Sequence, residues 1–325
     1  MTNISRRSFN RGISATAMSI VAAPAIAQSY PSQDVHFICA FPAGSGADVI
    51  VRWYAEKLRP TMGATILVEN RVGAMAFLAT EYTARAKPDG YTIFLHGWSA
   101  IASANYLLKN PSIDATKALK LAGTMNRQPM MLVVDAKSPF KSLGELTTHV
   151  KAKKEKATFG TSNVLAQIMG ALYKEHEKLE AVEVVYRTAG DSLNDLSSGA
   201  LDYGVFDNIF AASQERAGRI RILGISTAQR MQATPQYATM AEQGVPMDVM
   251  GGFGMIVPSE TPRPVVDSIN RIFNQLTASE DAKKFFNTIA SDPWVSTVEQ
   301  SEVFLQGEIK KWADWVRIAK IAPLG

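Results

Sequence analysis

The sequence predicts an α/β fold of two lobes, each a mainly parallel sheet flanked by helices, with two hinge crossings between the lobes. Three observations predict it. Short apolar runs alternate with segments of helical periodicity, a pattern typical of parallel strands covered by helices. Two further strands, one near residue 131 and one near residue 254, separate successive sets of these units. Beyond the second of them, apolar residues fall at helical spacing.

The first set of units predicts three strands and two helices. Residues 35–41 form an apolar run, and Pro42, Gly44 and Gly46 then mark a tight turn before a helix. Strand and helix segments are expected, in order, at 35–41 and 49–58, at 65–68 and 74–86, and at 91–95 with a following loop.

A second set of units follows the strand at 130–134. Its strands and helices are expected at 158–160 and 165–176, at 182–186 and 192–198, and at 203–206 and 209–216. The glycine-marked strand at 251–258 then leads into helices at 264–276 and 299–318. The chain therefore divides into one discontinuous lobe, 28–131 plus 254–325, and a second lobe, 132–253. A ligand is expected in the cleft between them.

Composition excludes several classes of protein. The chain has 325 residues, 46% of them hydrophobic and 20% charged, which is typical of a globular protein large enough for two domains. The 34 basic and 30 acidic residues are interleaved, so we expect no nucleic-acid partner. Cys39 is the one cysteine, which excludes an internal disulfide framework and a cysteine-based zinc cluster. No motif indicates a cofactor or a metal.

The first 27 residues predict an export signal. Arg6 and Arg7 precede an apolar stretch at 13–23, and Ala25-Ile26-Ala27 provides a small-x-small cleavage site. The apolar stretch is shorter than the roughly 20 residues that span a bilayer. We therefore expect a twin-arginine signal cleaved after Ala27 and a periplasmic mature chain. The general export route remains an alternative.

Three small-residue turns are the candidate binding elements. They are residues 41–48 (Phe-Pro-Ala-Gly-Ser-Gly-Ala-Asp), 160–163 (Gly-Thr-Ser-Asn) and 188–192 (Thr-Ala-Gly-Asp-Ser), each between an expected strand and helix. Unpaired N–H groups and the positive end of the helix dipole favour an anion at such places. Plain turns with Ser45 or Asp48 as helix caps are the alternative, but convergence of three turns on one cleft favours the anion site.

Catalytic patterns are weaker. The four histidines lie outside any HExxH pattern, and Ser45 or Ser162 beside His96 is the only hydrolase constellation that can be assembled. Asp207 ends an expected strand, where it would face the cleft or cap the next helix. Trp98 would stack on a planar ligand or pack between the lobes.

Several stretches together resemble the Bug-type receptors, the periplasmic substrate-binding proteins of tripartite tricarboxylate transporters. The matching stretches are residues 41–48 with Arg52, 68–74 (Val-Glu-Asn-Arg-Val-Gly-Ala), 87–92 (Lys-Pro-Asp-Gly-Tyr-Thr), 185–187 near Gly190, 196–202, 241–244 and Lys311-Trp312. The chain departs from the family pattern where Pro-Pro-Gly-Gly is Pro42-Ala43-Gly44-Ser45, and where Asn-Arg-Pro-Gly-Ala-Gly-Gly is residues 70–76 (Asn-Arg-Val-Gly-Ala-Met-Ala). A third departure lies at 185–188, where Pro-Tyr-Lys-Gly is Val-Tyr-Arg-Thr.

The resemblance implies a Venus-flytrap fold of the type II periplasmic-binding-protein class, which encloses a small carboxylate between loops of both lobes. The altered stretches indicate a kept carboxylate pocket with a changed far end, for which Trp98 and Phe253 are expected walls. An aliphatic or an aromatic carboxylate would fit. The predicted ligand-binding residues are Phe41, Pro42, Ala43, Gly44, Ser45, Gly46, Asp48, Trp98, Ser162, Asn163, Tyr186, Thr188, Ala189, Gly190, Asp191 and Asp207.

The function predicted from the sequence is capture of a small organic carboxylate for delivery to the membrane subunits of a tripartite tricarboxylate-type transporter. No enzymatic activity and no cofactor are expected, and the mature chain is expected to be a monomer. Two alternatives stay open at this point. One is a ligand-dependent co-sensor for a signalling kinase, and the other is a periplasmic hydrolase.

Overall fold

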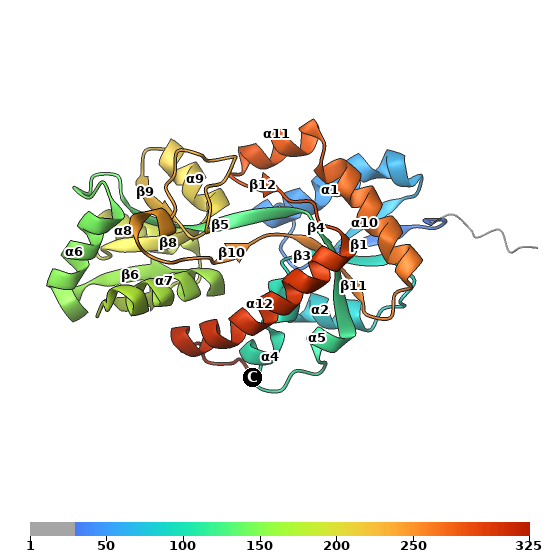
Figure 1. Cartoon of the computed structure of the whole chain (residues 1–325), viewed down its shortest axis with the longest axis horizontal. Helices are drawn as coiled ribbons and strands as arrows, with labels where there is room; N and C mark the ends of the chain where they lie inside the picture. The colour runs from blue at the N-terminus through green and yellow to red at the C-terminus, as the bar shows by residue number, and fades with distance from the viewer. Residues whose placement is uncertain (1–29) are drawn as a thin grey trace, which may run out of the picture.

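The computed structural model describes residues 30–325, which form two lobes side by side (Figure 1). The predicted export signal, residues 1–27, lies outside the described residues. The first lobe holds a five-stranded sheet in the order β2-β1-β3-β11-β4. Its strands are β1 (Val35–Cys39), β2 (Ile66–Asn70), β3 (Thr92–His96), β4 (Leu119–Thr124) and β11 (Gly254–Pro258).

The helices of the first lobe include the two that were expected early in the chain and the two at its end. They are α1 (Gly46–Met62), α2 (Phe77–Ala84), the short α3 (Ser99–Ala102), α4 (Ala104–Leu107) and α5 (Ala115–Ala118), then α10 (Arg263–Thr277), α11 (Glu280–Thr288) and α12 (Val298–Ala319). A 3-10 turn, Ala74–Ala76, precedes α2. Among residues 30–325, none of the helices combines the length and apolar character needed to cross a membrane.

The second lobe holds a seven-stranded sheet along the path β10-β5-β8-β6-β7, with β9 and β12 also paired to β5. Its strands are β5 (Asn126–Asp135), β6 (Thr158–Thr161), β7 (Val182–Val185), β8 (Tyr203–Asp207), β9 (Ile220–Ile225), β10 (Met250–Gly251) and β12 (Asp292–Pro293). Its helices are α6 (Leu143–Lys153), α7 (Val164–Glu177), α8 (Ala189–Ser198) and α9 (Asn208–Arg216).

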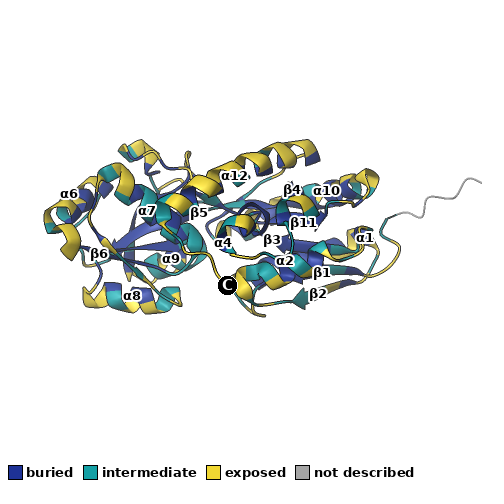
Figure 2. Cartoon of the chain, turned by 90° about the horizontal axis from the view of Figure 1, so that it is seen from below, coloured by how far each residue is buried: buried dark blue, intermediate teal, exposed yellow. Residues whose placement is uncertain are grey.

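The βα units form for the reasons that the sequence indicated. In α1 the buried residues Ile50, Val51, Tyr54 and Leu58 lie on one face at helical spacing, and they pack against the sheet. Gly63 ends the helix in the left-handed conformation, with φ 62°. The central strands, such as β1, β3 and β8, are buried between helices whose outer faces are exposed, whereas the edge strands β2 and β7 are partly exposed (Figure 2). The predicted two-lobed α/β fold is thus confirmed.

Both sheets are mixed. Parallel pairing joins β1 to β2 and β3 in the first lobe, and β6 to β7 and β8 in the second. The strands that cross between lobes run antiparallel to these, since β11 pairs antiparallel with β3 and β5 pairs antiparallel with β8. The mainly parallel expectation therefore holds for the βα units, whereas the crossing strands add antiparallel pairs.

The crossing expected as a single strand at 251–258 is broken into β10 and β11. The break lies at Gly252 and Phe253, which belong to neither strand. A Cβ on Gly252 would collide with the carbonyl oxygen of Asn126 and with the indole ring of Trp98. Glycine is therefore required here because another backbone segment and a ring approach too closely for a side chain.

Helix α12 extends over both lobes. It packs against β4 and α3 in the first lobe and against α7 in the second (Figure 1). One cluster of buried apolar side chains includes Phe94 of the first lobe, Phe159 of the second, and Leu305 and Trp312 of α12. Helix α12 therefore contacts elements of both lobes.

Candidate ligand-binding site

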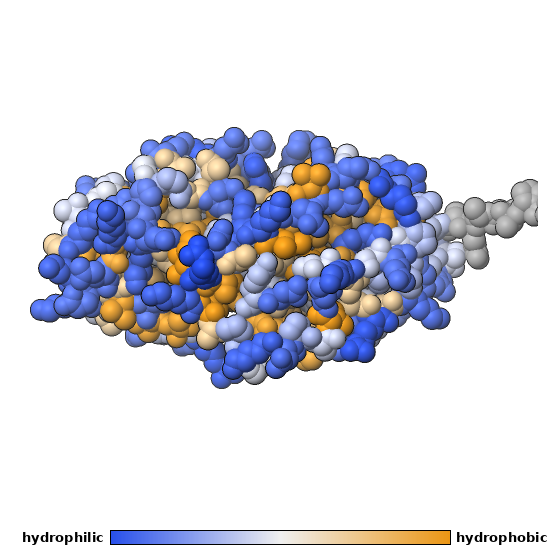
Figure 3. Space-filling model, turned by 60° about the horizontal axis from the view of Figure 1, so that its bottom comes forward, coloured by the Kyte–Doolittle hydropathy of each residue, from blue (hydrophilic) through white to orange (hydrophobic). Residues whose placement is uncertain are grey.

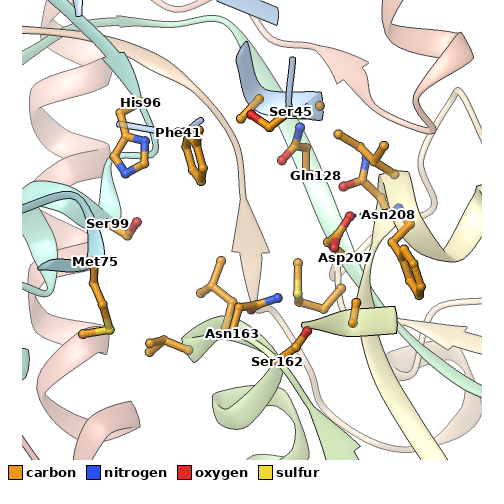
Figure 4. Close-up of a pocket in the computed structure, with 18 of the residues that line it drawn as sticks. Phe41, Ser45, Met75, His96, Ser99, Gln128, Ser162, Asn163, Asp207 and Asn208 are labelled. Carbon is orange, nitrogen blue, oxygen red and sulfur yellow. Dashed lines mark hydrogen bonds between the residues drawn. The ribbon is translucent and has the colours of Figure 1, made fainter. Parts of the chain in front are cut away.

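A cavity of about 710 Å³ lies between the two lobes. Its walls come from the starts of α1, α7, α8 and α9, from β3 and β5, and from α3, α4 and α12. In Figure 4, Asp207, Asn208 and Ser162 lie on one side of the cavity, and Met75, Ser99 and His96 lie on the other. Apolar side chains are exposed around the middle of the molecule, between more hydrophilic ends (Figure 3).

Four helices begin at this cavity. Strands β6, β7 and β8 are mutually parallel, so their carboxyl ends lie at one edge of the sheet, and α7, α8 and α9 start there. Helix α1 starts after the carboxyl end of β1 in the other lobe. The residues that cap these helices, Ser45, Asn163, Thr188 and Asp207, all line the cavity. We call the part of the cavity formed by these caps, with Ser162 and Asn208, the polar end.

Each cap residue orders the first turn of its helix. Ser45 Oγ accepts a hydrogen bond from Asp48 N (3.3 Å), Asn163 Oδ1 from Ala166 N (2.9 Å), Thr188 Oγ1 from Asp191 N (3.2 Å) and Asp207 Oδ1 from Phe210 N (2.9 Å). The first two N–H groups of each helix have no acceptor within the helix. Those N–H groups and the positive ends of four helix dipoles make the polar end suited to an anion.

Two ionisable side chains stand among the caps. Arg187 is exposed at the rim, whereas Asp207 is half-buried and lines the polar end. Burial raises the pKa of the Asp207 carboxyl above its usual value, and the hydrogen bond from Phe210 N opposes that rise. A bound anion would be repelled by an ionised Asp207, so protonation of this carboxyl favours anion binding.

Eight of the predicted residues line the cavity. Phe41, Ser45 and Gly46 come from the first lobe, and the others come from the second lobe. These second-lobe residues are Ser162, Asn163, Thr188, Ala189 and Asp207. The small-residue turns therefore converge at one place, and the contact of each residue with a ligand stays a prediction.

The remaining residues predicted in the first turn do not line the cavity. Pro42, Ala43 and Gly44 are exposed, and Gly44 has a positive φ of 81°. The Asp48 carboxylate is buried inside the lobe, where it accepts hydrogen bonds from Gly44 N (2.8 Å), Arg52 Nε (2.7 Å) and Asn70 Nδ2 (2.7 Å).

Because of these bonds Asp48 holds the turn to α1 and β2. Burial alone would raise the pKa of its carboxyl, but the hydrogen bonds from Arg52, Asn70 and Gly44 outweigh burial and lower it. Asp48 therefore supports the loop at residues 41–48 and does not itself face the cavity.

Four further predicted residues lie outside the lining of this cavity. Trp98 is buried, and its Nε1 donates to Glu308 Oε2 at 3.2 Å, so its ring packs at the junction of the lobes. Tyr186 Oη donates to Asp195 Oδ2 at 2.6 Å. Asp191 Oδ2 accepts a hydrogen bond from Thr188 Oγ1 at 2.7 Å, so the Asp191 carboxylate is directed toward the residue that caps α8. Gly190 lies in the first turn of α8 outside the set of lining residues.

Further residues that line the cavity were not predicted to bind the ligand. They include Met75, Phe77, Ala100, Ser103, Leu107, Gln128, Met130, Val164, Leu165, Arg187, Asn208, Ile209, Phe210 and Trp312. They come from elements far apart in the sequence, and the family stretches had included only Met75, Arg187 and Trp312 among them. Met75, Phe77, Ala100 and Leu107 form an apolar wall on the first-lobe side, so the cavity combines an anion site with apolar walls.

His96 faces this cavity within a group of aromatic rings. Its ring centroid lies 4.9 Å from those of Phe41 and Phe94 and 6.1 Å from that of Phe253. Burial lowers the pKa of His96 to about 4, so its ring is neutral at pH 7. Among residues 30–325, no hydrogen bond joins His96 to Ser45 or Ser162, and no group of three or more potential ligand side chains could hold a metal ion.

Known proteins resemble this chain over most of its length. Protein BugT of Bordetella pertussis is 28% identical over 91% of this chain and 92% of its own. A solved structure of the periplasmic binding protein BugD is 25% identical, covers 91% of this chain and 100% of its own, and has a TM-score of 0.75. The structure of R. palustris Rpa4515 with adipate is 24% identical over 91% of this chain and 100% of its own, with a TM-score of 0.79, and shares the fold.

The family is shown by a match over most of the chain. Residues 50–321 match the family described as tripartite tricarboxylate transporter family receptor. This is a family of substrate-binding receptors and not of enzymes, so the hydrolase alternative loses its support. The resemblance noted from the sequence motifs is confirmed: the chain belongs to the tripartite tricarboxylate transporter receptor family.

Proposed function

We propose that this chain is a periplasmic receptor that binds a small organic carboxylate between its lobes and delivers it to the membrane subunits of a tripartite tricarboxylate-type transporter. The observation that carries the proposal is the convergence of four helix N-termini, from both lobes, on one cavity of about 710 Å³. Their first-turn N–H groups supply donors at fixed positions, which is what a carboxylate requires.

The apolar side of the cavity narrows the class of ligand. Met75, Phe77, Leu107 and Leu165 would contact a hydrocarbon body, whereas the polar end would hold the carboxylate. A solved structure with the same fold carries adipate, whose carboxylates flank an aliphatic body. An aliphatic or aromatic carboxylate is therefore the proposed ligand class.

Delivery from the periplasm accords with the first 27 residues. The signal pattern with cleavage after Ala27 would release residues 28–325.

We propose that the first lobe comprises residues 28–131 plus 254–325 and that the second comprises residues 132–253. With this division the chain crosses between the lobes within β5 and at the break between β10 and β11. Because the polar end is shared between lobes, a bound anion would favour the closed arrangement.

Native purification followed by mass spectrometry of the denatured protein tests the binding proposal. We expect a small organic acid to be released, and isothermal titration with that acid to give saturable binding. Turnover of generic esters by the same sample, or a released compound that lacks an acidic group, would contradict the proposal. Uptake of the labelled acid should be lost when the gene for this chain is deleted. Unchanged uptake with a lost transcriptional response would support the co-sensor instead.

A further inference from the structure

The cavity continues into a smaller pocket at the junction of the lobes. This back pocket has a volume of about 130 Å³ and shares Phe41, His96, Gln128 and Trp312 with the main cavity. Its other walls include Trp98 and the backbone of residues 251–253, where β10 breaks from β11. A ligand held at the polar end can therefore extend into it.

Three residues that line this back pocket each have a buried side-chain nitrogen without a hydrogen-bond partner among residues 30–325. These nitrogens are Trp312 Nε1, His96 Nδ1 and Gln128 Nε2. The Trp312 side chain is 2% exposed and His96 is 8% exposed. Leaving a buried polar group without a partner is unfavourable, so two unpaired donors and an unpaired imidazole nitrogen around one pocket indicate a built site for a polar atom.

The chemistry of the three groups sets what they bind. The indole N–H of Trp312 and the amide N–H of Gln128 donate only, so the partner must be an acceptor oxygen. The neutral imidazole of His96 supplies either a donor or an acceptor at Nδ1, and it can therefore accommodate a hydroxyl as well as a carbonyl.

The charge of that oxygen follows from what surrounds it. No lysine, arginine, aspartate or glutamate is present among the described residues that line the back pocket. The nearby Glu308 is already bonded to Trp98 Nε1, and it forms an ion pair with Lys311 at 3.2 Å. A second carboxylate of the ligand in this pocket would lose its hydration without gaining a counter-charge. Removing an uncharged oxygen from water costs much less free energy.

We propose that the back pocket is a second subsite that binds an uncharged oxygen of the ligand, and that the ligand class is hydroxy- or oxocarboxylates. This inference rests on the proposed carboxylate-binding function. The carboxylate would occupy the polar end, the hydrocarbon body would lie along the apolar wall, and the hydroxyl or carbonyl oxygen would accept hydrogen bonds from Trp312 and Gln128.

Two matched series of acids test the subsite by isothermal titration. The aliphatic series is hexanoate, 6-hydroxyhexanoate and adipate, and the aromatic series is benzoate, 4-hydroxybenzoate and terephthalate. Within the series that binds, we expect the hydroxy acid to bind about tenfold more tightly than the other two acids, since it satisfies at least one buried donor.

Variants assign this preference to the back pocket. Gln128→Met removes the amide at nearly constant volume, and Trp312→Phe removes the indole N–H. Each should reduce the affinity ratio between the hydroxy acid and the unsubstituted acid by at least about threefold. Ser162→Ala, at the polar end, is the matched control, and it should weaken all three acids by the same factor.

The outcomes separate the two proposals. If the hydroxy and unsubstituted acids bind the wild-type protein equally, water fills the back pocket and the subsite is refuted while the carboxylate receptor stands. Tightest binding of the dicarboxylate would refute the uncharged character of the subsite. If none of the six acids binds, the co-purified compound decides. An acid without a hydroxyl or oxo group refutes the subsite alone, a hydroxy or oxo acid supports it, and a compound that is not an acid refutes the proposed function.

Discussion

Gly46 is the first residue of α1, and it faces the second lobe across the cavity. A Cβ at this position would lie 3.3 Å from Ile209 Cδ1 of α9. Within the same turn, Gly44 is the glycine with a positive φ, at 81°. Glycine at position 46 therefore provides space between the lobes, and a side chain there would not strain the backbone.

Replacing Gly46 with valine should weaken binding of the co-purified acid by about 100-fold, which is roughly 2.8 kcal/mol at 1.4 kcal/mol per decade. The branched side chain would separate α1 from α9 and cover the first-turn N–H groups. Gly144→Val is the matched control, because Gly144 stands in the first turn of α6 and a Cβ there meets nothing within 4 Å. Equal affinities of Gly46→Val and the wild type, measured by isothermal titration, would show that α1 does not contact the anion.

Asp207 introduces a negative charge into a site otherwise suited to an anion. Its raised pKa means that protonation becomes significant at higher pH than for an ordinary aspartate, and protonation removes the repulsion. We therefore expect the affinity for the acid to rise as the pH falls from neutrality toward the raised pKa.

The variant Asp207→Asn should remove that pH dependence. Asparagine keeps an acceptor for Phe210 N, so the cap of α9 is preserved while the charge is lost. Titrations between pH 5.5 and 8 should give nearly constant affinity for the variant, at least as tight as the wild type at pH 8. A pH profile identical to that of the wild type would exclude Asp207 as the titrating group.

At the scale of single elements, the helix caps combine stability with function. Asn163 caps α7 and lines the cavity, whereas Ser142 caps α6 and lies outside the set of lining residues. Either residue replaced by alanine should lower the free energy of unfolding by about 1 kcal/mol.

Only Asn163→Ala should also weaken ligand binding, because fraying of α7 displaces the N–H groups of the polar end. Chemical denaturation of both variants, with titration of each, separates the two effects. Equal loss of affinity in Ser142→Ala would mean that stability alone controls binding.

The sequence predicted the elements whose signals are local. Apolar runs predicted β1, β2, β3, β6, β7 and β8, whereas β4 and β9 were not predicted. Helices α10 and α12 begin and end within one or two residues of the expected helices. The small-residue turns also located the polar end, because cap residues and turn glycines act within a few residues of themselves.

Other features depend on approach between distant segments and were not predictable from local pattern. The break at Gly252 exists because Trp98 and Asn126 pack against it. Met75 and Ala76 stand where the family pattern has glycines, yet both adopt positive φ, 52° and 76°. The back pocket joins Gln128 of β5 to Trp312 of α12, two residues with no common motif.

At the scale of the whole molecule, α12 limits how far the two lobes can move relative to each other. Because it packs against elements of both lobes, closure must occur with α12 sliding over α7 or with small rotations about β5 and residues 251–253. We expect the mature chain to be monomeric and to close on its ligand. Small-angle scattering should give the mass of one chain and a smaller radius of gyration at saturation with the co-purified acid. An unchanged radius would argue against closure.

A crystal structure of the protein with its co-purified acid tests the central claim most directly. We expect the carboxylate oxygens to lie within about 3 Å of first-turn N–H groups from both lobes, those of Gly46 or Ala47 in α1 and those of α7 or α8. A carboxylate paired with Arg187 at the rim, and out of reach of the helix N-termini, would contradict it.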